Sequence, residues 1–119
     1  MCRTVLSVSH HSATQITRNL ILERAGYRVL STGDLREAIR LFESNEVHAV
    51  VLGDSISADN RQKLGGSLKR LKPPIPIVML CKMNDSRAVR EVADEQVESF
   101  HDPQFLLDAL KRVLQSSEK

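Results

Sequence analysis

Apolar and polar residues alternate along the chain in short blocks, and Ala49–Leu52 is the clearest apolar block. It is followed at once by Gly53, Asp54 and Ser55, a pattern typical of a strand that is buried on both faces and ends at a loop. Further apolar runs rich in β-branched residues predict four more strands. The five predicted strands cover residues 4–9, 27–32, 49–52, 75–81 and 97–100.

Between these runs, apolar residues recur at helical spacing and predict five helices. The second helix has the most regular pattern, with Asp34 as its cap and Glu37 as the reciprocal partner of that cap. The apolar stripes are Ile16, Leu20 and Ile21 after a cap at Ser12; Leu35, Ala38, Ile39 and Phe42 after Asp34; Leu64, Leu68 and Leu71 after Ser57 or Asp59; Ala88, Val89, Val92 and Ala93 after Asn84 or Asp85; and Leu106, Leu107, Leu110, Val113 and Leu114 after Pro103.

Glycines lie at the end of the first predicted helix and inside the third. Gly26 follows the first helix and is expected to end it in a left-handed conformation. Gly65 and Gly66 lie inside the third helix and should weaken it by about 1 kcal/mol each relative to alanine. A bent or frayed third helix is therefore expected.

Strands that alternate with helices across short loops predict an α/β fold, a single doubly wound sheet of five parallel strands with five helices. We expect the flavodoxin-like strand order 2-1-3-4-5, which brings the ends of the first and third strands side by side. One domain should cover residues 1–119, with a core at about residues 4–114 and a frayed tail from Gln115. This domain is either a stand-alone module or part of a longer protein.

Charge and composition narrow the range of partners. The 17 basic and 15 acidic residues leave a net charge of +2, too little to attract nucleic acid or an anionic membrane. Basic residues near the third helix indicate a solvated helix face; they are Arg61, Lys63, Lys69, Arg70 and Lys72. The sequence predicts no nucleic-acid partner, no membrane span and no signal peptide, and hence a cytoplasmic protein with Cys2 and Cys81 as free thiols.

The segments 20–29 and 34–42 carry a resemblance to a known family. They look like the first helix through the second helix of the receiver domain of two-component response regulators, and the strand–helix alternation resembles that family over essentially the whole chain. The resemblance implies a chemotaxis-type signalling module rather than an enzyme. Its family members bind Mg²⁺ through acidic residues and take a phosphoryl group on an aspartate at the strand ends.

The functional positions of this family fall on unsuitable residues here. The acidic pair falls on Ser9 and His10, and the phosphoacceptor falls on Gly53, or on Asp54 if the strand slips by one residue. The Ser or Thr after the fourth strand becomes Cys81, and the Lys before Pro becomes Asp102. Mg²⁺ binding should be weak or absent, so the sequence predicts a pseudo-receiver that signals through protein contacts alone or competes with true receivers.

Two alternatives remain open at these strand ends. Asp54 is a candidate phosphoacceptor in a true receiver. A transition-metal or enzymatic site is the other alternative, with His10 as a general base held by a carboxylate. The candidate ligands are His10, His11, Asp54, Cys81, His101 and Asp102, and their spacing lacks the close pattern of a zinc motif.

The resemblance also implies a surface for pairing, made by the fourth helix, the fifth strand and the fifth helix. Charges of both signs lie along it, which is compatible with a symmetric homodimer or with an ordinary solvated surface. The candidate interface residues are Arg87, Arg90, Glu91, Asp94, Asp108, Lys111 and Arg112.

Overall fold

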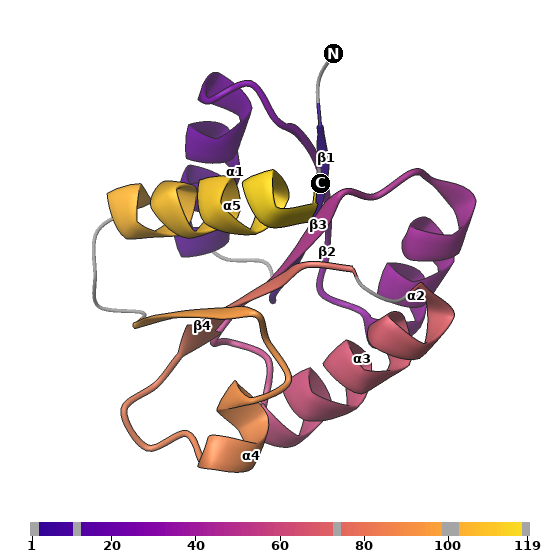
Figure 1. Cartoon of the computed structure of the whole chain (residues 1–119), viewed down its shortest axis with the longest axis vertical. Coiled ribbons are helices and arrows are strands. Elements are labelled where there is room, and N and C mark those ends of the chain that lie inside the picture. Colours follow the sequence, from indigo (N-terminus) through magenta and orange to yellow (C-terminus); the bar gives the residue numbers. More distant parts are fainter. Residues whose placement is uncertain (1–2, 11–12, 73–74, 99–102, 118–119) are drawn as a thin grey trace.

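The computed structural model describes residues 3–10, 13–72, 75–98 and 103–117, and it confirms the predicted fold class. Five parallel strands form one sheet in the order β2-β1-β3-β4-β5 (Figure 1). The strands are β1 (Thr4–Val8), β2 (Arg28–Thr32), β3 (Ala49–Leu52), β4 (Ile77–Cys81) and β5 (Glu95–Glu98), and the helices are α1 (Ala13–Arg24), α2 (Leu35–Ser44), α3 (Ala58–Leu71), α4 (Arg87–Arg90) and α5 (Pro103–Ser117).

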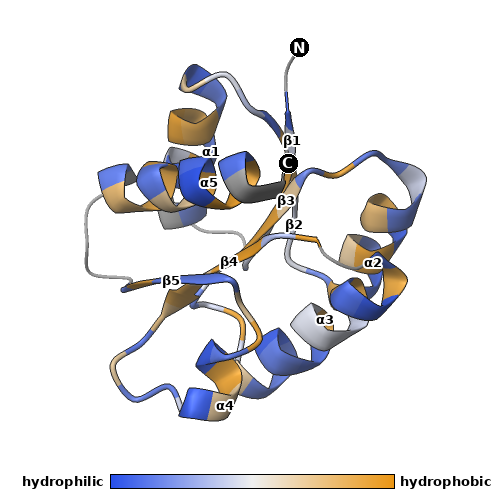
Figure 2. Cartoon of the chain, viewed as in Figure 1, coloured by the Kyte–Doolittle hydropathy of each residue, from blue (hydrophilic) through white to orange (hydrophobic). Residues whose placement is uncertain are grey.

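The central strand β3 divides its side chains between two cores. Val50 and Leu52 pack with residues of α2 and α3, whereas Ala49 and Val51 pack with residues of α1 and α5. All four are fully buried, as their unbroken apolar run predicts. Figure 1 shows the corresponding layers, with α1 and α5 on one side of the sheet and α2, α3 and α4 on the other. In Figure 2 the central strands β3 and β4 are mostly hydrophobic, whereas the edge strand β5 is mostly hydrophilic.

Helix α2 forms as its sequence predicts. The carboxylate of Asp34 accepts hydrogen bonds from the backbone N–H groups of Arg36 and Glu37 at 2.8 and 3.4 Å, and it therefore caps the helix. Ala38 and Phe42 are buried against the sheet. The predicted reciprocal bond from Glu37 is not the contact observed, because the Glu37 carboxylate pairs with Arg40 one turn later.

Helix α1 presents a different face from the one predicted. Ile16 and Leu20 are 46% and 51% exposed, whereas Gln15 and Leu22 are buried. Leu22 packs into the apolar core, and at the edge of the sheet the exposed Ser31 of β2 accepts hydrogen bonds from Gln15 and from Asn19, both at 3.0 Å. The cap predicted at Ser12 lies outside the described residues. Gly26 follows the helix at φ 101°, as expected for a left-handed C-terminal residue.

Helix α3 runs without interruption through its two glycines, so the expected fraying is not observed. Ser57 rather than Asp59 is its cap, and Leu71 of the predicted stripe is exposed. A β-carbon on Gly65 would lie 2.1 Å from a methyl carbon of Val92, so the missing side chain provides the space into which Val92 packs.

The segment after β4 departs most from the prediction. Helix α4 has a single turn, capped by Ser86 rather than by Asn84 or Asp85, and β5 begins two residues earlier than expected. Asp94 explains the early strand, because its N–H donates to the carbonyl of Ile77 and its carboxylate accepts from the N–H of Ile77, both at 2.8 Å. These two bonds bring the chain onto the edge of β4 before residue 97.

Helix α5 begins at Pro103 as predicted and extends to Ser117, so Gln115 is helical rather than frayed. Leu106, Leu110 and Leu114 are buried along its inner face. Within the described residues, no helix combines the length and the apolar character that a membrane span requires.

Candidate functional site

The candidate site lies where β1 and β3 end. The two strands pair in parallel with Val8 opposite Leu52, so the next residues, Ser9 and Gly53, lie side by side. The N–H of Gly53 donates to the carbonyl of Val8 at 2.7 Å, which continues the pairing past the end of β3. The strand register therefore brings together Ser9 and Gly53, two of the positions that the family resemblance assigns to phosphorylation.

Ser9 fills the space beside Gly53. A β-carbon on Gly53 would lie 2.4 Å from the β-carbon of Ser9 and 3.2 Å from its hydroxyl oxygen, too close for any side chain to fit without movement of the backbone. Ser9 is 2% exposed, and its hydroxyl has no hydrogen-bond partner among the described residues. With this backbone spacing, position 53 has no room for a carboxylate.

His10 is exposed and contacts the neighbouring loop through its backbone. Its N–H donates to the hydroxyl of Ser55 at 2.9 Å, and its α-carbon lies 3.4 Å from the position of a β-carbon on Gly33. This contact fixes the loop after β1 against the loop after β3. It uses no imidazole nitrogen, so it gives no support to a general-base role of His10.

Asp54 is partly buried, and its charge is felt by Arg18 of α1. Burial lowers the pKa of the Arg18 guanidinium, and the negative charge of Asp54 partly offsets that shift. The negative charge of Asp54 therefore interacts with the positive charge of Arg18. The interaction pairs Asp54 with a cation of the protein and does not supply a second carboxylate that could hold a metal ion.

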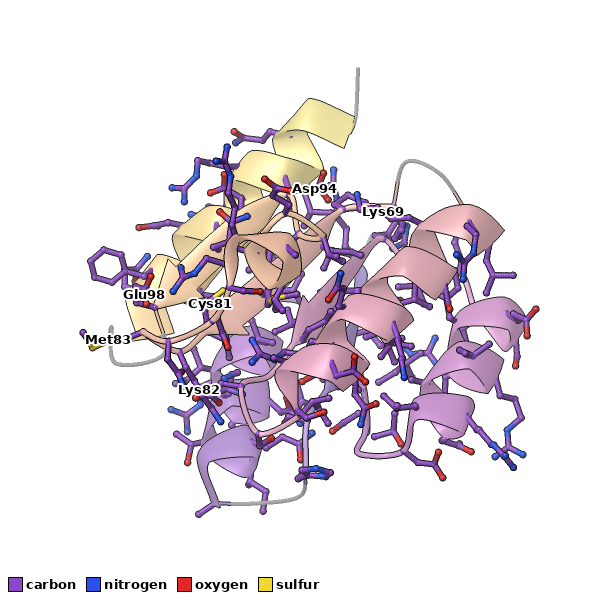
Figure 3. All side chains as sticks on the ribbon, turned by 90° about the horizontal axis from the view of Figure 1, so that it is seen from below. Lys69, Cys81, Lys82, Met83, Asp94 and Glu98 are labelled. Atoms are coloured by element: carbon purple, nitrogen blue, oxygen red, sulfur yellow. The ribbon has the colours of Figure 1, made fainter. Side chains whose placement is uncertain are left out.

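Cys81 is fully buried at the end of β4 (Figure 3), and its thiol lies 3.8 Å from the carbonyl oxygen of Met79. Burial raises the pKa of the thiol, and the nearby charge of Arg90 only partly opposes this effect. Cys81 is therefore a neutral, inaccessible thiol at physiological pH, a poor nucleophile and a poor metal ligand.

The rest of the predicted pocket cannot be placed beside these residues. His11, His101 and Asp102 lie outside the described residues. Across the part of the chain that the structure describes, no three His, Cys, Asp or Glu side chains are grouped as a metal site would require.

The most conspicuous polar contact near the strand ends was not predicted. Arg61 of α3 is 1% exposed and forms a bidentate ion pair with Asp85, which is 4% exposed in the turn after β4, at distances of 2.8 and 2.9 Å. The hydrogen bonds from Arg61 lower the pKa of Asp85. The expectation that Arg61 lies on a solvated face is wrong. Its spacing of three and seven residues from the buried Leu64 and Leu68 was the available signal.

Most charges on the predicted pairing surface are already paired within the chain. The carboxylate of Asp94 accepts from Lys69 at 2.9 Å, and Figure 3 shows these two side chains together at the amino end of β4. The other pairs are Arg87 with Glu91 at 2.8 Å, Arg90 with Glu98 at 2.9 Å, and Arg112 with Glu95 at 2.6 Å, while Asp108 accepts from Gln104 at 2.9 Å. Few of the predicted interface charges are therefore available for pairing between copies.

Comparison with solved structures gives clear matches to receiver domains. The chain is similar to a CheY-like response regulator receiver domain protein from Methanospirillum hungatei, with 20% identity, a TM-score of 0.81, and 99% of this chain and 98% of that chain covered. It is also similar to a putative response regulator from Chloroflexus aurantiacus, with 23% identity, a TM-score of 0.83 and coverage of 97% and 99%.

A third similar structure is the signal receiver domain of an HD domain-containing protein from Pseudomonas fluorescens, with 18% identity, a TM-score of 0.87 and coverage of 99% and 98%. A scan against protein-family models found no match, and neither did a search of curated proteins. The structural matches establish the CheY-like fold over nearly the whole chain.

Proposed function

We propose that this protein is a pseudo-receiver, a cytoplasmic signalling module of two-component type that acts by protein contact and does not depend on phosphorylation. The proposal rests on the close approach of Ser9 to Gly53, which leaves no room for an acceptor side chain at the position to which the resemblance assigns the acceptor. The receiver-like fold supports the signalling role, and the filled acceptor position supports the loss of chemistry.

The neighbouring residues support the same conclusion. Phosphoryl transfer in receivers needs a divalent cation to neutralise the developing charge, and carboxylates hold that cation. Ser9 and His10 offer a buried hydroxyl and an exposed imidazole instead. We therefore propose that Mg²⁺ binds weakly or not at all, and that the strand ends carry neither an enzymatic site nor a transition-metal site.

An amide-resolved NMR titration tests this proposal. Mg²⁺ is added first, followed by beryllofluoride, which mimics a phosphoryl group on an aspartate. We expect no shifts at residues 9, 10, 53–55 and 81 beyond those caused by matched ionic strength. Saturable shifts at these residues, with a slowly exchanging beryllofluoride complex, would contradict the proposal.

A second candidate is a true receiver that is phosphorylated on Asp54, and the partial burial of this carboxylate at the end of β3 favours it. Incubation with acetyl phosphate and Mg²⁺ distinguishes the two, with phosphorylation read as an 80 Da mass increase of the intact chain, about the mass of one phosphoryl group. The matched control is Asp54→Asn. Labelling of the natural chain that disappears in this variant would establish Asp54 as the acceptor.

The partner is proposed to be another protein of a signalling pathway. A charge-paired homodimer through α4, β5 and α5 is the alternative, although its charges are largely paired within one chain. Light scattering at high protein concentration separates the two, because the homodimer predicts twice the monomer mass and a heterologous partner predicts the monomer mass.

A further inference from the structure

A cleft opens between α1 and α5 at the edge of the sheet where the strands begin. The two helices lie on the same side of the sheet (Figure 1), and the cleft is bounded by Arg3 before β1, by the turn at residues 25–27 and by the last turns of α5. Its volume is about 360 Å³, within the range of about 300–1,000 Å³ that is typical of pockets for small molecules. The candidate functional site lies at the opposite ends of the strands, so this α1–α5 cleft is a separate feature.

Gly26 places no side chain at the mouth of the α1–α5 cleft. Its φ of 101° is the left-handed conformation in which the chain leaves α1. Among the described residues, a β-carbon at position 26 would have no atom within 4 Å other than those of its chain neighbours. The turn from α1 into β2 therefore leaves the cleft open to solvent.

The walls of the cleft are partly apolar. Leu114 is 4% exposed, and Ala25 and Tyr27 line the cleft beside it. Burial raises the pKa of the Tyr27 phenol, and the positive charge of Arg3 partly opposes this shift. The phenol is therefore neutral at physiological pH, and Tyr27 contributes an aromatic ring and a hydroxyl donor.

The ionised side chains of the cleft are both cations. Arg3 and the exposed Lys111 line it, and of the described residues that line it none is acidic. Nη1 of Arg3 donates at 3.4 Å to the carbonyl of Leu114, one of the last four carbonyls of α5, which have no partner within the helix.

The ends of the two helices reduce this positive charge. The C-terminal ends of α1 and α5 both border the cleft, and each contributes roughly half a negative elementary charge. Two cations and two helix ends leave a net charge of about +1. This charge suits a monoanion better than a phosphate dianion.

We propose that the α1–α5 cleft binds a small organic monoanion, namely a carboxylate on an aromatic or other apolar body. The carboxylate binds between Arg3 and Lys111, because the fork of a guanidinium matches the two carboxylate oxygens. The apolar body packs against Leu114, Ala25 and Tyr27. The site uses none of the residues at the carboxyl ends of the strands, so it is independent of the proposed function.

An amide-resolved NMR titration of the whole chain with cinnamate tests the inference. We expect saturable shifts confined to residues 3, 25–27 and 111–115. Cinnamyl alcohol has the same apolar body without the charge, and acetate has the charge without the body, so each should bind at least about 5-fold more weakly than cinnamate. Absence of saturable shifts in the cleft, or equal affinity for cinnamate and cinnamyl alcohol, would overturn the inference.

Charge variants locate the bound carboxylate. Arg3→Gln and Lys111→Gln should each weaken cinnamate binding by at least about 5-fold. Lys111 is exposed, so its substitution leaves the fold intact even where loss of the Arg3 contact to α5 destabilises the chain.

The matched control is Arg112→Gln. It removes the same charge from the residue next to Lys111, which pairs with Glu95 of β5 at 2.6 Å, and it should change the affinity for cinnamate by less than about 2-fold. Equal losses of affinity in Lys111→Gln and Arg112→Gln would assign the binding to the overall charge of α5 and overturn the inference.

Discussion

At the scale of single residues, the contact between Ser9 and Gly53 decides what the strand ends can hold. The closest non-hydrogen contacts between real side chains are longer than the 2.4 Å that a β-carbon on Gly53 would make with Ser9. Glycine is therefore required at position 53 for reasons of space, since its φ is not in the left-handed region.

Replacing Gly53 with alanine tests this requirement. Gly53→Ala should lower the free energy of unfolding by about 1–3 kcal/mol, the usual cost of an extra carbon in a packed site, and Ser9→Gly in the same chain should restore much of the loss. Gly66→Ala is the control, because nothing lies within 4 Å of the added carbon and helix propensity should raise stability by about 0.5–1 kcal/mol. Urea denaturation measures all three, and equal midpoints for the two alanine variants would refute the steric explanation.

The buried thiol of Cys81 gives a second prediction at this scale. Because burial both raises its pKa and blocks access, Cys81 in the folded chain should react with a thiol reagent only when the chain opens. The labelling rate at pH 8 should rise with urea in parallel with unfolding, as measured in a Cys2→Ala chain. Fast labelling in the absence of urea would show that this end of β4 opens locally.

At the scale of whole elements, α1 and α2 show where sequence patterns succeed and fail. In α2 the apolar stripe and the capping residue predict the same helix, and the helix forms as predicted because both signals lie within its own sequence. In α1 the sequence pattern predicts that Ile16 and Leu20 face the core, but both side chains are exposed. Its inner face combines the buried apolar Leu22 with the buried Gln15, which donates a hydrogen bond to Ser31 of β2, and this match depends on how the helix packs on the sheet, which the sequence of α1 does not contain.

Matched substitutions in α1 check this orientation. Leu22→Ala should cost about 2–5 kcal/mol of unfolding free energy, because Leu22 has no exposed surface, whereas Leu20→Ala on the outer face should stay within about 0.5 kcal/mol of the natural chain. Chemical denaturation of the two variants gives the comparison. A larger loss in Leu20→Ala would mean that the outer face of α1 is buried, for instance in an oligomer.

The segment around α4 was the least predictable element for a related reason. Its course depends on contacts from far along the chain, namely Asp94 with Ile77, Val92 with Gly65 and Asp85 with Arg61. A local pattern cannot reveal these, although the buried spacing of Arg61 with Leu64 was available. The candidate acceptor pocket was easier to locate, because parallel strands bring their ends together whichever side chains they carry.

At the scale of the whole molecule, most of the two cores lies away from the strand ends that carry the candidate site. Both consist mainly of side chains from strands and from the inner faces of helices; loop residues such as Ile56 and Ile75 and the pocket residue Cys81 also belong to the first core. Ser9, His10 and Gly53 lie just beyond the ends of β1 and β3. The fold can therefore persist with different side chains at positions 9 and 10.

Global stability should depend on acid through Asp85. The hydrogen bonds from Arg61 lower the folded-state pKa of Asp85 below its unfolded value of about 3.9. The stabilising contribution is thus complete above about pH 4–5 and is lost as the pH falls through the folded-state pKa. Unfolding free energies measured from pH 6 to pH 2 should fall less steeply in Asp85→Asn than in the natural chain, and identical pH profiles would exclude this linkage.

The contact between Ser9 and Gly53 also restricts the order in which substitutions could place an aspartate at position 53. With the strand ends at this spacing, an aspartate that arises at position 53 first meets a clash, and loss of the Ser9 side chain alone leaves no carboxylate at that position. Each single step is therefore unfavourable or without benefit, and the order of substitutions matters. Descendants of this sequence should therefore change their outer surfaces far more readily than they acquire an aspartate at position 53.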